Sequence, residues 1–260
     1  MSQSFDLLIE LMTRLRGDKG CPWDKQQTHE SLKPYLIEET HEVIEAIDKR
    51  DSAHLEEELG DLLLQIVFHS EIEREKGGFS IDDVITGLVE KLKGRHPHVF
   101  GDADLHSSEQ VLKNWEKNKM LEKKGSRESY LDGVPPTLPG LMRAQKIQKK
   151  AARAGFDWRN NEEVIEKFKE EWAELAEAMQ SKNEEKIEEE MGDLFFTLVN
   201  LARTFKLDAE QTLGGSIEKF IFRFKAMERQ ARKNGVLLED LDPAGLDRLW
   251  LTAKKLKDPP

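Results

Sequence analysis

EETHEVIEAIDKRDSAHLEEELGDL, residues 38–62, matches EEWAELAEAMQSKNEEKIEEEMGDL, residues 170–194, without a gap. Within each stretch, apolar residues recur every three or four positions, as they do along one face of an α-helix. A polar break near the middle predicts two helices joined by a short turn, and Thr28, Ser52 and Ser80 sit where helix N-caps belong. The repetition predicts an all-α protein made of two similar units in tandem.

The repetition extends beyond these two stretches, with small changes in offset. The further pairs are Lys91 and Arg95 with Lys219 and Arg223, and Trp115 and Lys119 with Trp250 and Lys254. Between the halves, residues 125–138 contain several Gly and Pro residues, which is typical of a linker. We therefore expect an N-terminal domain at residues 1–124, a linker at 125–138 and a C-terminal domain at 139–260, each domain a bundle of four or five helices.

The composition limits the range of functions. Of 260 residues, 51 are Asp or Glu and 40 are Lys or Arg, which gives a formal net charge of −11. An acidic chain lacks the basic face with which nucleic-acid binders release counterions, so no nucleic-acid partner is expected. The longest uncharged apolar runs span about nine residues, whereas a membrane helix needs about twenty. With a single cysteine, Cys21, and no signal-peptide pattern, we expect a cytoplasmic protein that does not bind a membrane.

The acidic residues of the second stretch lie where a buried face is expected. In its first helix, Glu171 continues the apolar stripe that includes Val164, and Glu174 lies one turn further on. In its second helix, Glu190 interrupts a similar stripe and Asp193 follows by one turn. If the two helices pack antiparallel, as a short connection favours, the four carboxylates meet. The matching residues of the N-terminal half are Glu39, Glu42, Glu58 and Asp61.

Carboxylates gathered in one place need a counter-charge. Two of them about 4 Å apart repel each other by roughly 4 kcal/mol at an effective dielectric constant near 20, and burial adds a desolvation cost. Either protons or cations must therefore neutralise the cluster. Because the set offers oxygen ligands and no His or Cys, it favours Mg²⁺, with Mn²⁺ as a substitute, over zinc or copper.

Other motifs accompany the acidic ones in a fixed order. They are Cys21-Pro22-Trp23-Asp24, Glu38-Glu39-x-x-Glu42, Glu57-Glu58-x-Gly60-Asp61, Gly94-Arg95-His96-Pro97-His98-Val99-Phe100, Gly155-Phe156-Asp157-Trp158 and the second acidic set. Together they resemble the MazG family of all-α nucleoside triphosphate pyrophosphohydrolases, and the resemblance covers nearly the whole chain. It implies Mg²⁺-dependent hydrolysis of nucleoside triphosphates to monophosphate and pyrophosphate, with broad base tolerance, in a homodimer.

The chemistry of this reaction suggests roles for individual residues. Metal ions on Glu171, Glu174, Glu190 and Asp193 would neutralise the phosphates and activate the attacking water. Glu170 or Glu174 could accept the proton of that water. The candidate nucleotide-binding residues, all in the C-terminal half, are Lys167, Lys186, Glu189, Lys219, Arg223, Trp250 and Lys254.

Two cations distinguish the halves. Lys167 and Lys186 each precede an acidic motif by one helical turn, whereas Tyr35 and His54 occupy the matching positions of the N-terminal half. A substrate with several anionic oxygens needs such fixed charges. We therefore expect the C-terminal half to carry the main activity, and the N-terminal metal set to be weaker, altered or chiefly structural.

Some features have simpler interpretations. Trp250 could pack in the core and not stack on a base. Lys219 and Arg223 could form a solvated helix face and not a phosphate-binding pair. A di-iron carboxylate bundle needs Glu-x-x-His on two helices. Only Glu38-Glu39-Thr40-His41 supplies this motif, because the C-terminal half has Ala173 at the position that matches His41. A non-catalytic helical dimer that senses nucleotides would require the same acids as the enzyme, so the sequence separates these two alternatives poorly.

Overall fold

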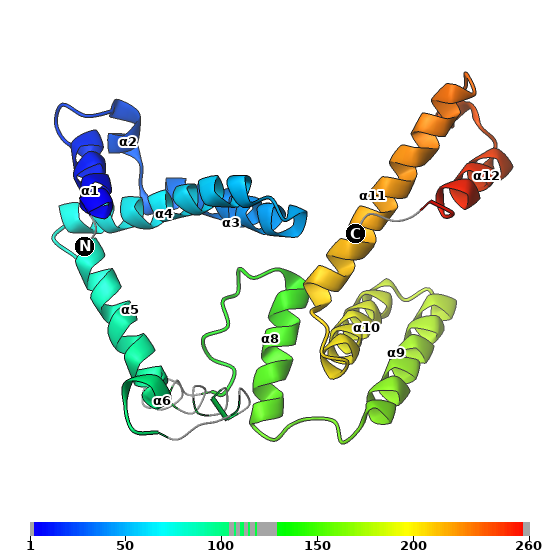
Figure 1. Cartoon of the computed structure of the whole chain (residues 1–260). Coiled ribbons are helices and arrows are strands. Elements are labelled where there is room, and N and C mark those ends of the chain that lie inside the picture. The colour runs from blue at the N-terminus through cyan, green and yellow to red at the C-terminus, as the bar shows by residue number, and fades with distance from the viewer. Residues whose placement is uncertain are drawn as a thin grey trace. The chain divides into compact units, whose positions relative to one another are not determined.

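The computed structural model describes residues 3–103, 107, 110–111, 114, 118 and 129–256, and every regular element in these ranges is a helix (Figure 1). The expectation of an all-α fold is thereby confirmed. The contacts between residues group the chain into two compact units, Met1–Lys124 and Gly125–Pro260. Within the described ranges, none of the helices combines the length and hydrophobicity that a bilayer crossing demands.

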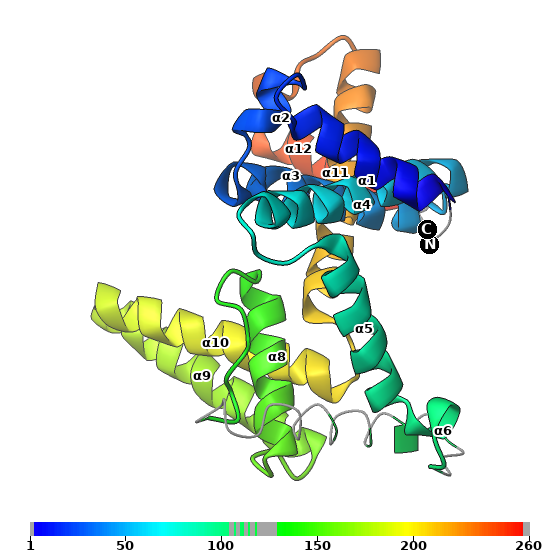
Figure 2. The same cartoon turned by 90° about the vertical axis from the view of Figure 1, so that its left-hand side faces the viewer.

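The first unit is centred on a hairpin of two long helices. Its described helices are α1 (Gln3–Arg16), α2 (Pro22–Gln26), α3 (His29–Lys49), α4 (Ser52–Glu75), α5 (Ile81–Arg95) and α6 (Pro97–Phe100). Helices α3 and α4 lie side by side in both views (Figures 1 and 2). One hydrophobic cluster joins α1 and α5 to this hairpin, and its buried members are Met12, Leu32, Val67, Phe68, Ile72 and Ile81.

The second unit follows the same plan. Its helices are α8 (Gly140–Arg153), α9 (Asn161–Ser181), α10 (Glu184–Thr204), α11 (Ala209–Lys233) and α12 (Pro243–Ala253), with a short 3-10 turn at Leu238–Asp240. Helices α9 and α10 form the hairpin, α8 packs on α10, and α12 packs on α11. Ala226, Met227 and Ala253 form the buried contact between α11 and α12.

The two hairpins begin and turn at equivalent residues. Helices α3 and α9 both contain 21 residues, and the side chains of Thr28 and Asn160 cap their N-termini. Each of the two helices ends in a residue with left-handed backbone conformation, Arg50 at φ 55° and Lys182 at φ 53°. Such a residue directs the chain out of the helix, so α4 and α10 can start directly afterwards. The repeat in the sequence is therefore a repeat of the backbone as well.

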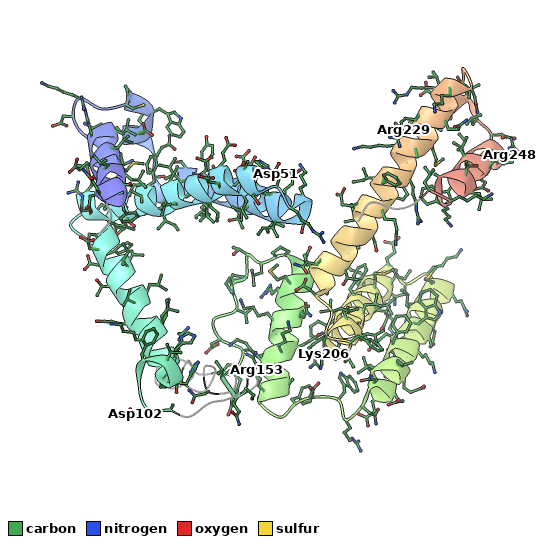
Figure 3. All side chains as sticks on the ribbon, in the orientation of Figure 1. Asp51, Asp102, Arg153, Lys206, Arg229 and Arg248 are labelled. Carbon is green, nitrogen blue, oxygen red and sulfur yellow. The ribbon has the colours of Figure 1, made fainter. Side chains whose placement is uncertain are left out.

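The cap of α4 differs from the expected one. The sequence places Ser52 at this N-cap, whereas in the structure Asp51 takes the position and Ser52 is the first helical residue. Asp51 Oδ1 accepts hydrogen bonds from the backbone N–H groups of Ala53 and His54, both at 3.2 Å (Asp51 is labelled in Figure 3). A carboxylate also interacts favourably with the positive end of the helix dipole, so Asp51 is the better cap. The caps expected at Thr28 and Ser80 are confirmed.

Leu32 and Val164 test whether the two hairpins rest on equivalent cores. They occupy matching positions in α3 and α9, with exposed fractions of 1% and 0%. Leu32→Ala should lower the free energy of unfolding by about 2–5 kcal/mol, and Val164→Ala by about 1.5–3 kcal/mol, because each substitution leaves a cavity. Denaturant unfolding followed by far-UV circular dichroism measures both. Lys33→Ala, at an exposed neighbouring position, should cost less than about 0.5 kcal/mol; equal losses in all three variants would contradict the assignment of the cores.

Candidate metal centre

Three of the four predicted ligands of the C-terminal half converge between α9 and α10. Glu171 and Glu174 of α9 and Glu190 of α10 each offer a carboxylate oxygen, and these oxygens lie within 4.8 Å of one another. Glu171 is only 5% exposed, because it lies on the face of α9 that also buries Val164. Asp193 lies one turn beyond Glu190 on α10 and is outside the converged set, but its charge acts on Glu190. We call Glu171, Glu174 and Glu190 the C-terminal acidic cluster.

The N-terminal half contains a similar set between α3 and α4. Glu39, Glu58 and Asp61 offer carboxylate oxygens within 4.8 Å of one another, and Glu58 is buried. The predicted fourth member, Glu42, acts on Glu58 electrostatically but lies outside the converged set. Glu39 and Glu58 match Glu171 and Glu190, so the two clusters share two positions. The third member differs, because Asp61 matches Asp193 and not Glu174.

Both clusters hold carboxylates that repel one another. Burial, followed by the charges of Glu174 and Glu171, raises the pKa of Glu190. Burial and neighbouring acids likewise raise the pKa values of Glu39 and Glu58. A divalent cation would relieve this repulsion, and the converged donors are all carboxylate oxygens, as a hard cation requires. Neither converged set contains a histidine, which argues against the di-iron alternative.

The cations next to the acids differ between the halves. Lys167 Nζ lies 2.6 Å from Glu170 Oε1 and 2.8 Å from Glu171 Oε1. Its hydrogen bonds to Glu170 and Glu171 raise the pKa of Lys167. Tyr35 occupies the equivalent position in α3 and carries no charge beside Glu39. Lys167 is therefore placed at the C-terminal acidic cluster, as the sequence predicts, and it contacts the acids themselves.

The second pair of matching positions shows a similar difference. Lys186 lies in the first turn of α10, one turn before Glu190. In the N-terminal half its equivalent is His54, whose Nε2 lies 2.8 Å from Glu58 Oε1. Glu189, another predicted nucleotide-binding residue, directly precedes Glu190, and its charge contributes to the raised pKa of Glu190.

The other four predicted nucleotide-binding residues lie on α11 and α12. Lys219 and Arg223 are one turn apart on α11, and Trp250 lies on α12 one turn before Lys254, the residue that caps this helix. The ring centroid of Trp250 is 5.4 Å from that of Phe220, and Lys254 Nζ is 5.7 Å from the Trp250 ring centroid. Trp250 is thus already in contact with an aromatic ring and a cation.

These four residues belong to α11 and α12, which pack on each other. Trp250 packs against the buried contact between α11 and α12, which agrees with the core interpretation of this residue. Helix α11 packs mainly on α12, whereas α9 and α10 pack mainly on each other. The converged carboxylates of the C-terminal acidic cluster come from α9 and α10, and the four residues belong to other helices. Trp115 and Lys119, the expected N-terminal counterparts of Trp250 and Lys254, lie outside the described residues.

Ion pairs that the sequence did not predict hold the loops before the acidic helices. Asp157, in the Gly-Phe-Asp-Trp motif, pairs with Arg203 on α10, and Arg203 Nε also donates to Asn200 Oδ1 at 2.9 Å. In the first unit, Arg16 at the end of α1 pairs with Glu75 on α4 at 2.7 Å, and its Nη1 donates to the backbone oxygen of Gln27, just before α3, at 3.3 Å. Both pairs anchor the entry of the acidic helix to the second arm of the hairpin. The sequence motifs lie in or near these loops but do not predict the ion pairs. The paired residues are 46 and 59 positions apart in the sequence, and motif spacing relates only residues that are close in the sequence.

Two helical hairpins, each with carboxylates from both arms close enough to share a metal ion, define an all-α protein with two candidate metal sites. The model of the MazG nucleotide pyrophosphohydrolase domain matches residues 27–100 and 159–227, which contain the two hairpins. The chain therefore belongs to the MazG family of nucleotide pyrophosphohydrolases.

Two relatives extend the match over nearly the full chain. The chain is 48% identical to the nucleoside triphosphate pyrophosphohydrolase/pyrophosphatase MazG of Thermotoga maritima over 250 residues, which cover 96% of this chain and 95% of the relative. It is 43% identical to the nucleoside triphosphate pyrophosphohydrolase of Escherichia coli K12 over 254 residues, which cover 96% and 97%. Both relatives thus share the two-unit length of this chain.

The raised pKa of Glu190 predicts how the metal-free protein responds to pH. A proton on such a carboxyl stabilises the folded state; this contribution is complete at low pH and is lost as the pH rises through the raised pKa. Glu190→Gln mimics the protonated form, so in EDTA it should unfold at a higher temperature than the wild type near neutral pH. This advantage should shrink as the pH falls below the raised pKa.

Thermal unfolding with EDTA and with excess Mg²⁺ measures this effect. Mg²⁺ should reverse the order of the two proteins, because an amide is a weaker ligand for the cation than a carboxylate. Glu166→Gln serves as the control, since Glu166 lies in an exposed pair with Lys169. A wild type that is more stable than Glu190→Gln in EDTA at neutral pH would show that the neighbouring carboxylates do not destabilise the ionised form of Glu190.

Proposed function

We propose that the C-terminal half hydrolyses nucleoside triphosphates to the monophosphate and pyrophosphate, with Mg²⁺ on the C-terminal acidic cluster and Asp193, and with Mn²⁺ able to replace it. The observation that carries this proposal is the convergence of carboxylates from α9 and α10 beside Lys167. The names of the Thermotoga maritima and Escherichia coli relatives support the reaction.

The charge of the substrate explains the need for a cation. A triphosphate would be repelled by carboxylates alone. When bound, Mg²⁺ would supply the positive charge that offsets the carboxylates and the phosphates, and would lower the pKa of a water molecule. Lys167 and Lys186 add positive charges beside the acidic motifs, and these charges hold the phosphates in position for attack at the α-phosphorus.

One carboxylate accepts the proton of the attacking water in this proposal. Glu170 is exposed and lies outside the converged carboxylates. Glu174 is exposed and belongs to the C-terminal acidic cluster. Glu174 is therefore the better placed of the two candidates, since a general base must lie within hydrogen-bond reach of the water.

The two halves share a scaffold but differ in cations, and this supports a division of roles. We assign the main catalytic site to residues 139–260, after a linker at 125–138. The domain at residues 1–124 keeps the carboxylates Glu39, Glu58 and Asp61, but has Tyr35 and His54 in place of the two lysines. Its site is expected to bind a metal and to turn over little substrate.

An exposed apolar groove supports pairing of two copies. It has a volume of about 760 Å³, lies between α8, α10 and α11, and is lined among others by Phe195, Phe196, Leu198 and Leu213, each more than 40% exposed. Large apolar patches of this kind mark interaction sites. A homodimer through this groove would cover these apolar side chains.

Separate variants of the two clusters test the division of roles. Glu171→Gln should reduce the rate of pyrophosphate release by about 100-fold or more, since even changes around metal ligands cost 10- to 100-fold. Glu39→Gln should retain most of the activity. Release is measured with a coupled pyrophosphate assay at saturating Mg²⁺. An inactive Glu39→Gln beside an active Glu171→Gln would reverse the assignment.

Hydrolysis in ¹⁸O-labelled water tests the position of attack. Attack at the α-phosphorus places the label in the monophosphate, whereas attack at the β-phosphorus places it in the pyrophosphate, and mass spectrometry distinguishes the two products. We expect the label in the monophosphate. Nucleotide binding without any hydrolysis would instead favour a nucleotide-sensing role.

A further inference from the structure

We propose that Lys167 is an exchangeable counter-ion of the C-terminal acidic cluster. It neutralises Glu170 and Glu171 while the site holds no metal, and it moves to the phosphate oxygens when the metal and nucleotide enter. The inference rests on the proposed function of this site. Its consequence is that metal alone binds weakly and that nucleotide strengthens metal binding.

The position of Lys167 makes it a direct competitor of a metal ion. Its Nζ contacts Glu171 Oε1 at 2.8 Å, and Glu171 belongs to the converged carboxylates. The lysine side chain is 34% exposed and that of Glu171 is 6% exposed. The ammonium group therefore reaches the buried acid from the more exposed side, from which a charged substrate would also approach.

An ammonium group and a divalent cation on one carboxylate repel each other. Mg²⁺ binds carboxylate oxygens at about 2.0–2.1 Å, so both positive charges would lie within a few ångströms, where repulsion is strong. Lysine has a flexible stem and rotatable donors, so the ammonium group can leave without a change in the backbone. Phosphate oxygens of the substrate offer it a new anionic partner.

The N-terminal half shows what the scaffold looks like without this competitor. Tyr35 replaces Lys167, and the basic residue of that half, His54, contacts Glu58 at 2.8 Å. Glu39, the equivalent of Glu171, thus has an uncharged aromatic residue one turn before it. A lysine is therefore no requirement for folding this hairpin, and its presence in the C-terminal half points to a role toward ligands.

Metal binding measured apart from catalysis tests the exchange. All proteins carry Glu39→Gln, so that the C-terminal acidic cluster dominates the signal, and Mn²⁺ binding is followed by electron paramagnetic resonance. Lys167→Met is compared with the Glu39→Gln parent and with Lys169→Met. The latter removes the same charge from an exposed pair with Glu166 on the same helix. Lys167→Gln serves as a second, polar replacement, and thermal unfolding confirms that each variant is folded.

The expected result has two parts. Without nucleotide, Lys167→Met and Lys167→Gln should bind Mn²⁺ about fivefold or more tightly than the parent and Lys169→Met, which is the lower range of typical coupling between sites. A non-hydrolysable triphosphate analogue should then strengthen Mn²⁺ binding less in these two variants than in the parent. The tighter binding follows because the competing ammonium group is absent.

Other results overturn the inference. Mn²⁺ affinity without nucleotide that is unchanged or lower in both Lys167 variants would show that the lysine does not compete with the metal. Equal strengthening by the analogue in parent and variants would show that the lysine does not move to the phosphates. Pyrophosphate release by the wild-type protein is measured in parallel. A wild type that releases none contradicts the proposed function, whereas an active wild type without exchange in the variants contradicts this inference alone.

Discussion

The burial of acidic side chains within a helical hairpin is the constraint on which the rest of the structure depends. Glu171 and Glu58 take positions in apolar stripes where a leucine would be more stable. Each is surrounded by further carboxylates from both arms of its hairpin. Such an arrangement lowers the stability of the folded hairpin unless positive charge neutralises the carboxylates.

The rest of each unit holds the two arms in register around these acids. The Asp157–Arg203 and Arg16–Glu75 pairs fix the loops that lead into the acidic helices. On this shared backbone the two halves differ in single side chains beside the cluster. Lys167 places a positive charge next to Glu171, whereas Tyr35 places none next to Glu39.

The sequence predicts the helices, the repeat and most of the acidic clusters, because all of these depend on spacing along one helix or on one short turn. It does not predict which acid completes each cluster. Glu174 completes one cluster and Asp61 the other, and spacing along a single helix does not define which acid of one arm reaches those of the other arm. The sequence also does not predict the left-handed backbone conformation of Arg50 and Lys182, because glycine is the usual residue in that conformation. The ion pairs of the loops, and the packing of α11 and α12 on each other, involve distant residues and need the folded chain.

The short turn of each hairpin has a consequence for how these proteins can change over time. Only two residues separate the end of α9 from the start of α10, and the same is true of α3 and α4. An α-helix rotates by about 100° per residue, so one inserted residue between the turn and Glu190 would carry that acid to another side of its helix. Substitutions can therefore accumulate in these hairpins, whereas insertions and deletions between the acids would be removed by selection.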